Sequence, residues 1–297
     1  MMRIKQLLFV KIIAFLVLFS ACRNESPDSR AFYDTDSTKS IEETVKKAKS
    51  IFYHMYLPSE MYKVFEKAGA IYNPDILNPV ENVNLYETSA KAAMNMGIYG
   101  VDLSYNKMFG QNQKTLLYFS VIHKLSQQLG IPDMKFAMAL KRMEKNISNR
   151  DSLTQYAMDI YVSANHFLNE NDRQSISAMI LAGGWIEALY IATKIADENT
   201  SNQEIIERIA FQKYSLRTLV SLLNNYQSEP NITKYLLMLN SLNKTFDKFD
   251  IYYERGDVSI DTINKLISTH KVDFTMQQKD LKEIKSVIEQ IRKDMVE

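Results

Sequence analysis

The sequence predicts an all-α fold, either a helical bundle or stacked helical hairpins, of about ten to eleven helices. The first observation is the scarcity of helix breakers: 8 glycines and 6 prolines occur in 297 residues, far below the usual share of about 12%. The second is that apolar residues recur every three or four positions in long segments. The third is a lack of sustained apolar and polar alternation between turn signals, the pattern typical of half-buried strands.

Residues 1–21 have the pattern of a secretory signal peptide. Three basic residues, Arg3, Lys5 and Lys11, come first. A short apolar run follows, and small residues then lead to Cys22. The run is much shorter than the ~20 residues that a membrane-spanning helix needs, so the segment is interpreted as a cleaved leader.

The stretch LFSAC, which ends at Cys22, resembles a bacterial lipobox, in which the cysteine is lipidated and becomes the first mature residue. Phe19 departs from the leucine that is usual at its position. The resemblance implies attachment to a membrane through acyl chains such as palmitate, because each buried CH₂ contributes about 0.8 kcal/mol. The alternative is an ordinary cleaved signal with an incidental cysteine. Cys22 is the only cysteine, so the domain has no disulfide.

A polar tether follows the lipidation site and bears on the expected location. Residues 22–40 have no apolar period and are interpreted as a flexible linker. Arg23 stands where lipoproteins retained in the inner membrane often carry aspartate, which by analogy favours the outer membrane, facing the periplasm. Of 36 basic residues, removal of the three in the signal leaves 33 against 35 acidic ones, so no basic field predicts nucleic-acid binding.

Residues 41–297 are predicted to form a single all-helical domain, beginning with two short helices and a loop. Segment 41–56 places apolar residues on one face. Ser59 can cap the next helix, after Pro58. Two prolines then fix the stretch AIYNPDILNPV, 70–80, as a loop.

Long periodic segments follow this loop. The stretch GIPD separates two of them, because glycine ends a helix and Pro132 is tolerated in the first turn of the next. The last segment has a charged face and is predicted to be an amphipathic helix. The predicted helices are 83–109, 112–129, 132–146, 152–169, 172–196, 202–226, 233–254, 260–270 and 277–295.

Two apolar segments share an unusual composition. GIYGVDLSY, 97–105, and GGWIEALYI, 183–191, both combine glycines, an aromatic residue, an acid and a tyrosine. Glycine inside a helix costs about 1 kcal/mol relative to alanine, so we expect close packing against another helix to offset that cost. Aligning Asp102 with Glu187 also aligns Tyr105 with Tyr190. This similarity indicates either an internal duplication or two buried helices that meet the same general packing requirements.

These two segments supply most of the candidate site. A carboxylate in an apolar helix must be paired, hydrogen-bonded or protonated. One interpretation is therefore a structural pair in which Arg217 or a lysine is the counterion. The other is a polar cleft between the two helices that binds a sugar, a peptide or an amine against aromatic walls. The candidate ligand-binding residues are Tyr99, Asp102, Tyr105, Trp185, Glu187, Tyr190 and Arg217.

The motifs that usually carry catalysis or metal binding are not found. None of the four histidines lies in an HExxH arrangement. There is no GxSxG nucleophile elbow and no glycine loop that could cradle a phosphate. The single cysteine is already assigned to the lipid. The sequence therefore predicts no catalytic residue, no metal and no cofactor.

The leading functional hypothesis is a non-enzymatic binding or scaffold protein anchored in the cell envelope. Its expected partners are the membrane, through the lipid, and an envelope protein or a small polar ligand. One alternative is a hydrolase or lyase that uses Asp102 and Glu187 in a helical cleft. Another is an accessory subunit of an envelope complex, which docks through the aromatic N-terminal helices of residues 41–69.

Three stretches of this lipobox-bearing chain resemble a group of uncharacterised all-helical lipoproteins of Gram-negative bacteria. They are NMGIYGVDLSYNKMFGQ (95–111), KLSQQLGIPD (124–133) and AGGWIEALYIATK (182–194). The resemblance implies an all-helical envelope protein. It implies no substrate, cofactor or catalytic residue.

Overall fold

The computed structural model describes the chain in several ranges, which are 64–133 except 68, 151–198, 203–253, 258–261, 266–269 and 272–297, with the single positions 46 and 141. The predicted signal peptide, Cys22 and the tether of 22–40 lie outside these residues. So do nearly all of the predicted helices 41–56 and 132–146 and the first part of the helix after Pro58.

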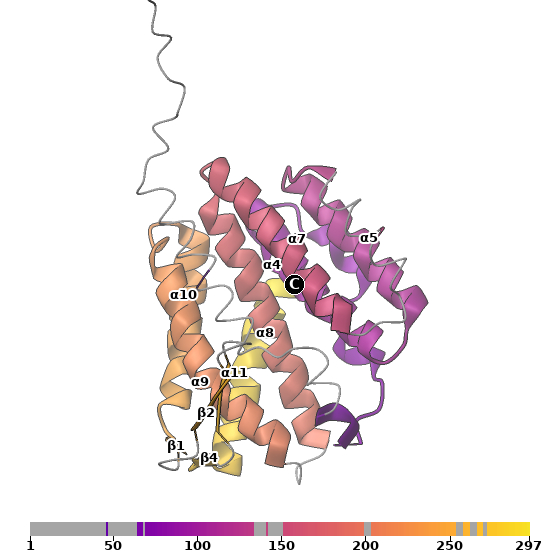
Figure 1. Cartoon of the computed structure of the whole chain (residues 1–297). Coiled ribbons are helices and arrows are strands. Elements are labelled where there is room, and N and C mark those ends of the chain that lie inside the picture. Colours follow the sequence, from indigo (N-terminus) through magenta and orange to yellow (C-terminus); the bar gives the residue numbers. More distant parts are fainter. Residues whose placement is uncertain are drawn as a thin grey trace, which may run out of the picture. The chain divides into compact units, whose positions relative to one another are not determined.

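Helices make up most of the described chain, which confirms the predicted all-α class (Figure 1). The predicted number of helices and the internal duplication stay predictions. Two short 3₁₀ helices come first, η1 (Pro74–Ile76) and η2 (Val80–Leu85). The α-helices are α4 (Ser89–Met108), α5 (Asn112–Gln128), α7 (Asp151–Glu170), α8 (Gln174–Glu198), α9 (Gln203–Asn224), α10 (Pro230–Phe246) and α11 (Gln278–Val296).

Local capping explains where several helices begin. The predicted helix 83–109 is wrong at its start, because the chain leaves helical geometry after η2 and restarts at α4. The Thr88 side chain accepts a hydrogen bond from the Lys91 backbone N–H at 3.2 Å and so satisfies a free donor of the first turn. At α11, Gln277 and Asp280 form a reciprocal capping box.

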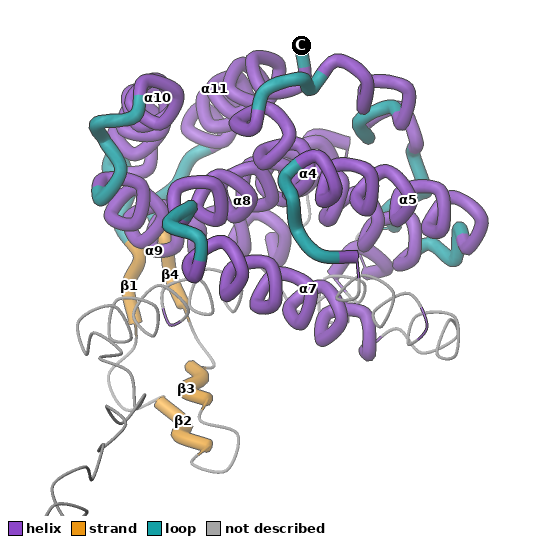
Figure 2. The backbone as a smooth tube through the Cα atoms, turned by 90° about the horizontal axis from the view of Figure 1, so that it is seen from above, coloured by secondary structure: helices purple, strands orange, loops and turns teal. Residues whose placement is uncertain are grey.

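Four short strands correct the prediction for the region after α10. α10 ends at Phe246, and the residues predicted to continue as helix to 254 and to form another helix at 260–270 instead contain strands (orange in Figure 2). β1 (Ile251–Tyr253) pairs antiparallel with β4 (Val272–Phe274), and β2 (Val258–Asp261) pairs antiparallel with β3 (Leu266–Thr269). The strands are rich in β-branched residues, which favour extended backbone over helix.

The helix α8 occupies the core of the described fold. It packs against α4, α7, α9 and α11 (Figure 2). Within the described residues, one segment, Gln174–Ala196, is long and apolar enough to cross a membrane, but 89% of its apolar 18-residue stretch is buried inside the fold. Its composition is therefore explained by burial against other helices on several sides.

α4 and α8 cross at close range, and this approach depends on two glycines. A Cβ atom at Gly97 would overlap the carbonyl oxygen of Ile180, and one at Gly183 would overlap the carbonyl oxygen of Met94. The expectation of close packing is thus confirmed for this pair. It is wrong for Gly100, where no neighbouring atom lies within 4 Å. Gly184 is intermediate, because a Cβ atom there would lie 3.5 Å from the carbonyl oxygen of Gly97.

Candidate functional site

The glycine-containing motifs of α4 and α8 face each other at the crossing of the two helices. Met94 contacts Gly183, Gly97 contacts Gly184, and further along Asp102 lies beside Glu187. The two helices therefore run in the same direction where they cross. This arrangement brings the two acids singled out in the sequence to one point inside the fold.

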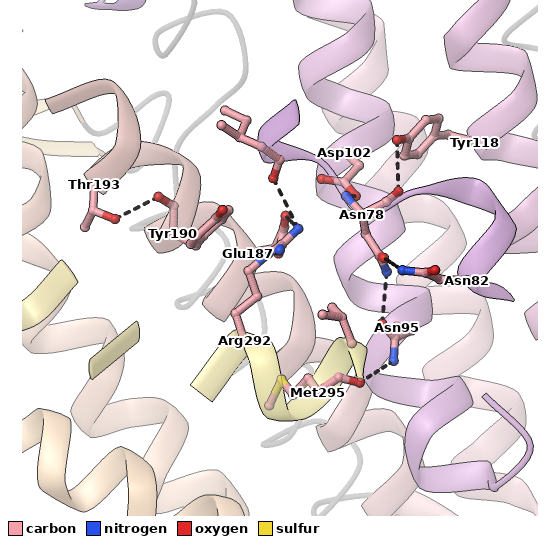
Figure 3. A network of polar contacts seen from close by, with 12 residues as sticks. Asn78, Asn82, Asn95, Asp102, Tyr118, Glu187, Tyr190, Thr193, Arg292 and Met295 are labelled. Atoms are coloured by element: carbon pink, nitrogen blue, oxygen red, sulfur yellow. Dashed lines mark hydrogen bonds and ion pairs between the residues drawn. The ribbon is translucent and has the colours of Figure 1, made fainter. Parts of the chain in front are cut away.

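Both acids are fully buried, and a third group, Arg292 of α11, completes the cluster (Figure 3). The Arg292 guanidinium donates to both carboxylate oxygens of Glu187, from Nε at 2.6 Å and from Nη2 at 2.9 Å. Nη2 also donates to the carbonyl oxygen of Ile76 at 3.2 Å. The ring centroid of Tyr190 lies 4.2 Å from the Arg292 Cζ, so the planar cation is also stacked on an aromatic face.

Arg217 is not the counterion of these acids, which corrects one of the sequence interpretations. Its guanidinium donates to Asp247 at 2.8 Å, and both side chains are about half exposed. The position on α9 explains the difference, because Arg217 lies on the solvent side of that helix. Arg217 therefore does not join the acids in one site.

Asp102 and Glu187 are in different electrostatic environments. One oxygen of Asp102, Oδ2, accepts a hydrogen bond from the Asn78 backbone N–H at 3.0 Å, whereas Oδ1 is buried and has no donor. Burial raises the pKa of Asp102 well above its usual range, and the charge of Glu187 and a hydrogen bond to it raise it further. Arg292 and the Asn78 N–H oppose this shift without cancelling it.

Asn78 links the loop between η1 and η2 to the acid pair and to its surroundings (Figure 3). Its carbonyl accepts from the Tyr118 hydroxyl at 2.9 Å, and its side-chain amide donates to Tyr86 Oη at 2.9 Å and to Asn95 Oδ1 at 3.1 Å. Its Oδ1 in turn accepts from Asn82 at 3.0 Å. Every polar group of this buried side chain has a partner, so the loop is fixed in one position over α4.

The last turn of α11 is held by side chains from α4 and the preceding loop. The carbonyl oxygen of Met295 accepts from Asn95 Nδ2 at 2.9 Å and from Lys91 Nζ at 3.2 Å. The Tyr86 hydroxyl donates to the carbonyl oxygen of Val296 at 3.2 Å. These donors satisfy carbonyls that a helix C-terminus leaves without intrahelical partners. They place Arg292 in register with Glu187.

The remaining candidate residues are buried in separate contacts. The Tyr99 hydroxyl donates to the Pro79 carbonyl at 2.8 Å, and Tyr105 Oη accepts from the Asn73 backbone N–H at 3.1 Å. Trp185 is completely buried, and its Nε1–H donates to Ser215 Oγ of α9 at 3.0 Å. The structure thus brings Asp102, Glu187 and Tyr190 together and uses the others to join neighbouring elements.

Replacing Ser215 with alanine should destabilise the protein by about 1–3 kcal/mol, because the buried Trp185 Nε1–H then loses its acceptor. Urea unfolding followed by the fluorescence of Trp185, the only tryptophan, measures the change. Exposed Ser120→Ala is the matched control and should change stability by less than about 0.5 kcal/mol. Equal effects of the two substitutions would contradict the proposed role of the hydrogen bond.

Arg292, Asn78 and Asn95 were not predicted as site residues from the sequence. A signal for Arg292 was present, because it lies one helical turn from Ile288 and next to Ile291, on the face of α11 that is otherwise apolar and buried. A charged residue on such a face needs a buried partner. For the two asparagines the sequence carried no comparable signal, since an uncharged amide is compatible with an exposed position as well as a buried one and its partners lie on other elements.

The geometry favours the structural interpretation of the acid pair over an open cleft. Neither carboxyl group is exposed, and both have partners inside the fold. In the described ranges, no group of three or more histidine, cysteine, aspartate or glutamate side chains is arranged to bind a metal ion.

In comparisons with known proteins, this chain matches no protein-family model, no curated protein and no solved structure.

Proposed function

We propose that the protein is a lipid-anchored protein of the bacterial envelope that binds or organises a partner without catalysis, as a binding or scaffold protein. The lipobox-like stretch at Cys22 and the polar tether support anchoring, in the outer membrane facing the periplasm. The observation that carries the non-enzymatic part is the complete burial of Asp102 and Glu187, the acids that the sequence offers for catalysis. They serve to hold helices together.

A hydrolase or lyase is the weaker alternative. General acid or base catalysis needs a carboxyl group within hydrogen-bond reach of the substrate, and both buried acids instead face Arg292 or the Asn78 backbone. An accessory subunit of an envelope complex is compatible with the main proposal. Its docking segment, 41–69, lies mostly outside the described residues.

Lipidation at Cys22 predicts a direct result. When the full chain is expressed in a Gram-negative host with a labelled fatty acid, the wild-type protein should incorporate the label and Cys22→Ser should not. The double variant Cys22→Ser with Ser29→Cys is the matched control, since it restores one thiol outside the lipobox-like stretch. Labelling of this control, or a mature wild-type protein that begins with an unmodified thiol, would contradict lipidation.

The non-enzymatic part has its own test. Purified wild-type protein should not turn over panels of sugar esters, peptides and glycosides. Turnover by the wild type that is lost in Asp102→Asn or Glu187→Gln variants that remain folded would overturn the proposal and restore the hydrolase or lyase. Circular dichroism of each variant provides the check on folding.

A further inference from the structure

The junction of α4, α8 and α11 buries two acidic groups and one basic group. Asp102 and Glu187 have no exposed surface, and the Arg292 side chain is 12% exposed. The positive charge of Arg292 is paired with Glu187, which it contacts with two hydrogen bonds. If both acids were ionised, the junction would carry one uncompensated negative charge away from water, which is strongly unfavourable.

The hydrogen bonds of Asp102 indicate that this acid is the one that stays neutral, by carrying a proton on Oδ1. Oδ2 accepts from the Asn78 N–H, so it is the natural carbonyl oxygen of a neutral acid. Oδ1 is buried and has no donor, so as a carboxylate oxygen it would be left unsatisfied. A proton on Oδ1 converts it into a donor, and the neighbouring acceptor is the Glu187 carboxylate.

Apart from Arg292, whose charge is paired with Glu187, the groups that act on Asp102 do not supply a positive charge. From the loop before η1, from α4 and from α5, the tyrosines Tyr72, Tyr99 and Tyr118 act on it, and each has a raised pKa through burial, with the charge of Asp102 contributing. From α8 the facing group is Glu187, and from α11 it is Arg292. Lys91 is directed to the last carbonyls of α11 instead.

We propose that this junction is a proton-binding site: Asp102 binds one proton at neutral pH and donates it from Oδ1 to Glu187, whose negative charge neutralises Arg292. The bound proton joins α4 to α8, as Arg292 joins α8 to α11. Loss of the proton in alkaline solution places two carboxylates side by side and weakens the junction. The site thus makes the packing of α4 against α8 dependent on pH.

The direction of the pH dependence follows from the raised pKa of Asp102. The folded protein keeps a proton that the unfolded chain releases near the ordinary aspartate pKa of about 3.9. The stabilisation by this proton is complete below that pH and is lost as the pH rises through the higher pKa of the folded state. Between the pKa of the unfolded aspartate and the raised pKa of folded Asp102, the unfolding equilibrium constant should rise up to about tenfold per pH unit through Asp102 alone.

Asp102→Asn tests the proposal because asparagine has the shape of the neutral acid. Its carbonyl can accept from the Asn78 N–H, and its amide can donate to Glu187, so it imitates the protonated state permanently. The variant should unfold no more readily than the wild type at neutral pH and should lack the loss of stability towards alkaline pH. Exposed Asp75→Asn is the matched control and should keep the wild-type pH profile.

Infrared spectroscopy of the purified full chain observes the proton directly and does not depend on how stable the variant is. The wild-type spectrum at neutral pH should contain the carbonyl band of a protonated carboxyl group that shifts on labelling with ¹³C-aspartate and disappears at alkaline pH. Absence of this band at neutral pH, or an Asp102→Asn profile of stability against pH that parallels the wild type, would overturn the proposal.

Discussion

Replacing Arg292 with methionine will lower the free energy of unfolding by about 3–5 kcal/mol at neutral pH, the largest effect expected for a single side chain in this fold. Methionine retains much of the buried volume, so the loss arises mainly from charge. Glu187 is completely buried and would lose both hydrogen bonds to its guanidinium partner. Ile76 O would lose a donor as well.

The matched control is Arg217→Met, which removes an arginine from a surface pair with Asp247. Solvent screens that pair, so the control should cost less than about 1 kcal/mol. Urea unfolding monitored by Trp185 fluorescence measures both variants under the same conditions. Similar losses for the two arginines would show that the buried pair has no special role. The contrast also tests the choice of counterion, because the sequence alone suggested Arg217 or a lysine.

Replacing Gly183 with alanine will destabilise the protein by about 2–3 kcal/mol through overpacking at the crossing of α4 and α8. The added methyl group would overlap the carbonyl oxygen of Met94 and lie 2.7 Å from its carbonyl carbon. These are backbone atoms of another helix, so no side-chain rotation can remove the clash. The two helices must separate instead.

The control for this prediction is Gly100→Ala on the same pair of helices. No atom lies within 4 Å of the added carbon at Gly100, so the substitution should be neutral or stabilise the protein by up to about 1 kcal/mol through helix propensity. Thermal unfolding followed by circular dichroism measures both variants. An unchanged melting temperature for Gly183→Ala would mean that the helices do not approach each other as closely as described.

The helical class could be predicted because it depends on signals that are local in the sequence. α5, α7 and α9 begin and end within two residues of their predicted limits. Apolar spacing marks each helix, glycines flank α5, and short polar links separate α7 and α9 from their neighbours. The strands after α10 were missed for the opposite reason. They are three or four residues long, and their pairing joins segments whose relation no local pattern reveals.

The candidate site was predictable only in part. Apolar surroundings were enough to identify Asp102 and Glu187 as acids that need partners. The identity of the partner depends on where α11 lies, and Arg292 is 105 residues away from Glu187 in the chain. The distinction between Gly183 and Gly100 has the same origin, because it depends on which side of each helix meets a neighbour.

The long separation between Glu187 and Arg292 has a consequence for biosynthesis. Arg292 follows Glu187 by 105 positions, and at usual rates of translation this stretch takes about 5–20 s to be made. During that interval a nascent chain that already contains α4 and α8 has no guanidinium for its buried glutamate, so the compact state is disfavoured. The chain becomes able to complete its core only when α11 has been synthesised.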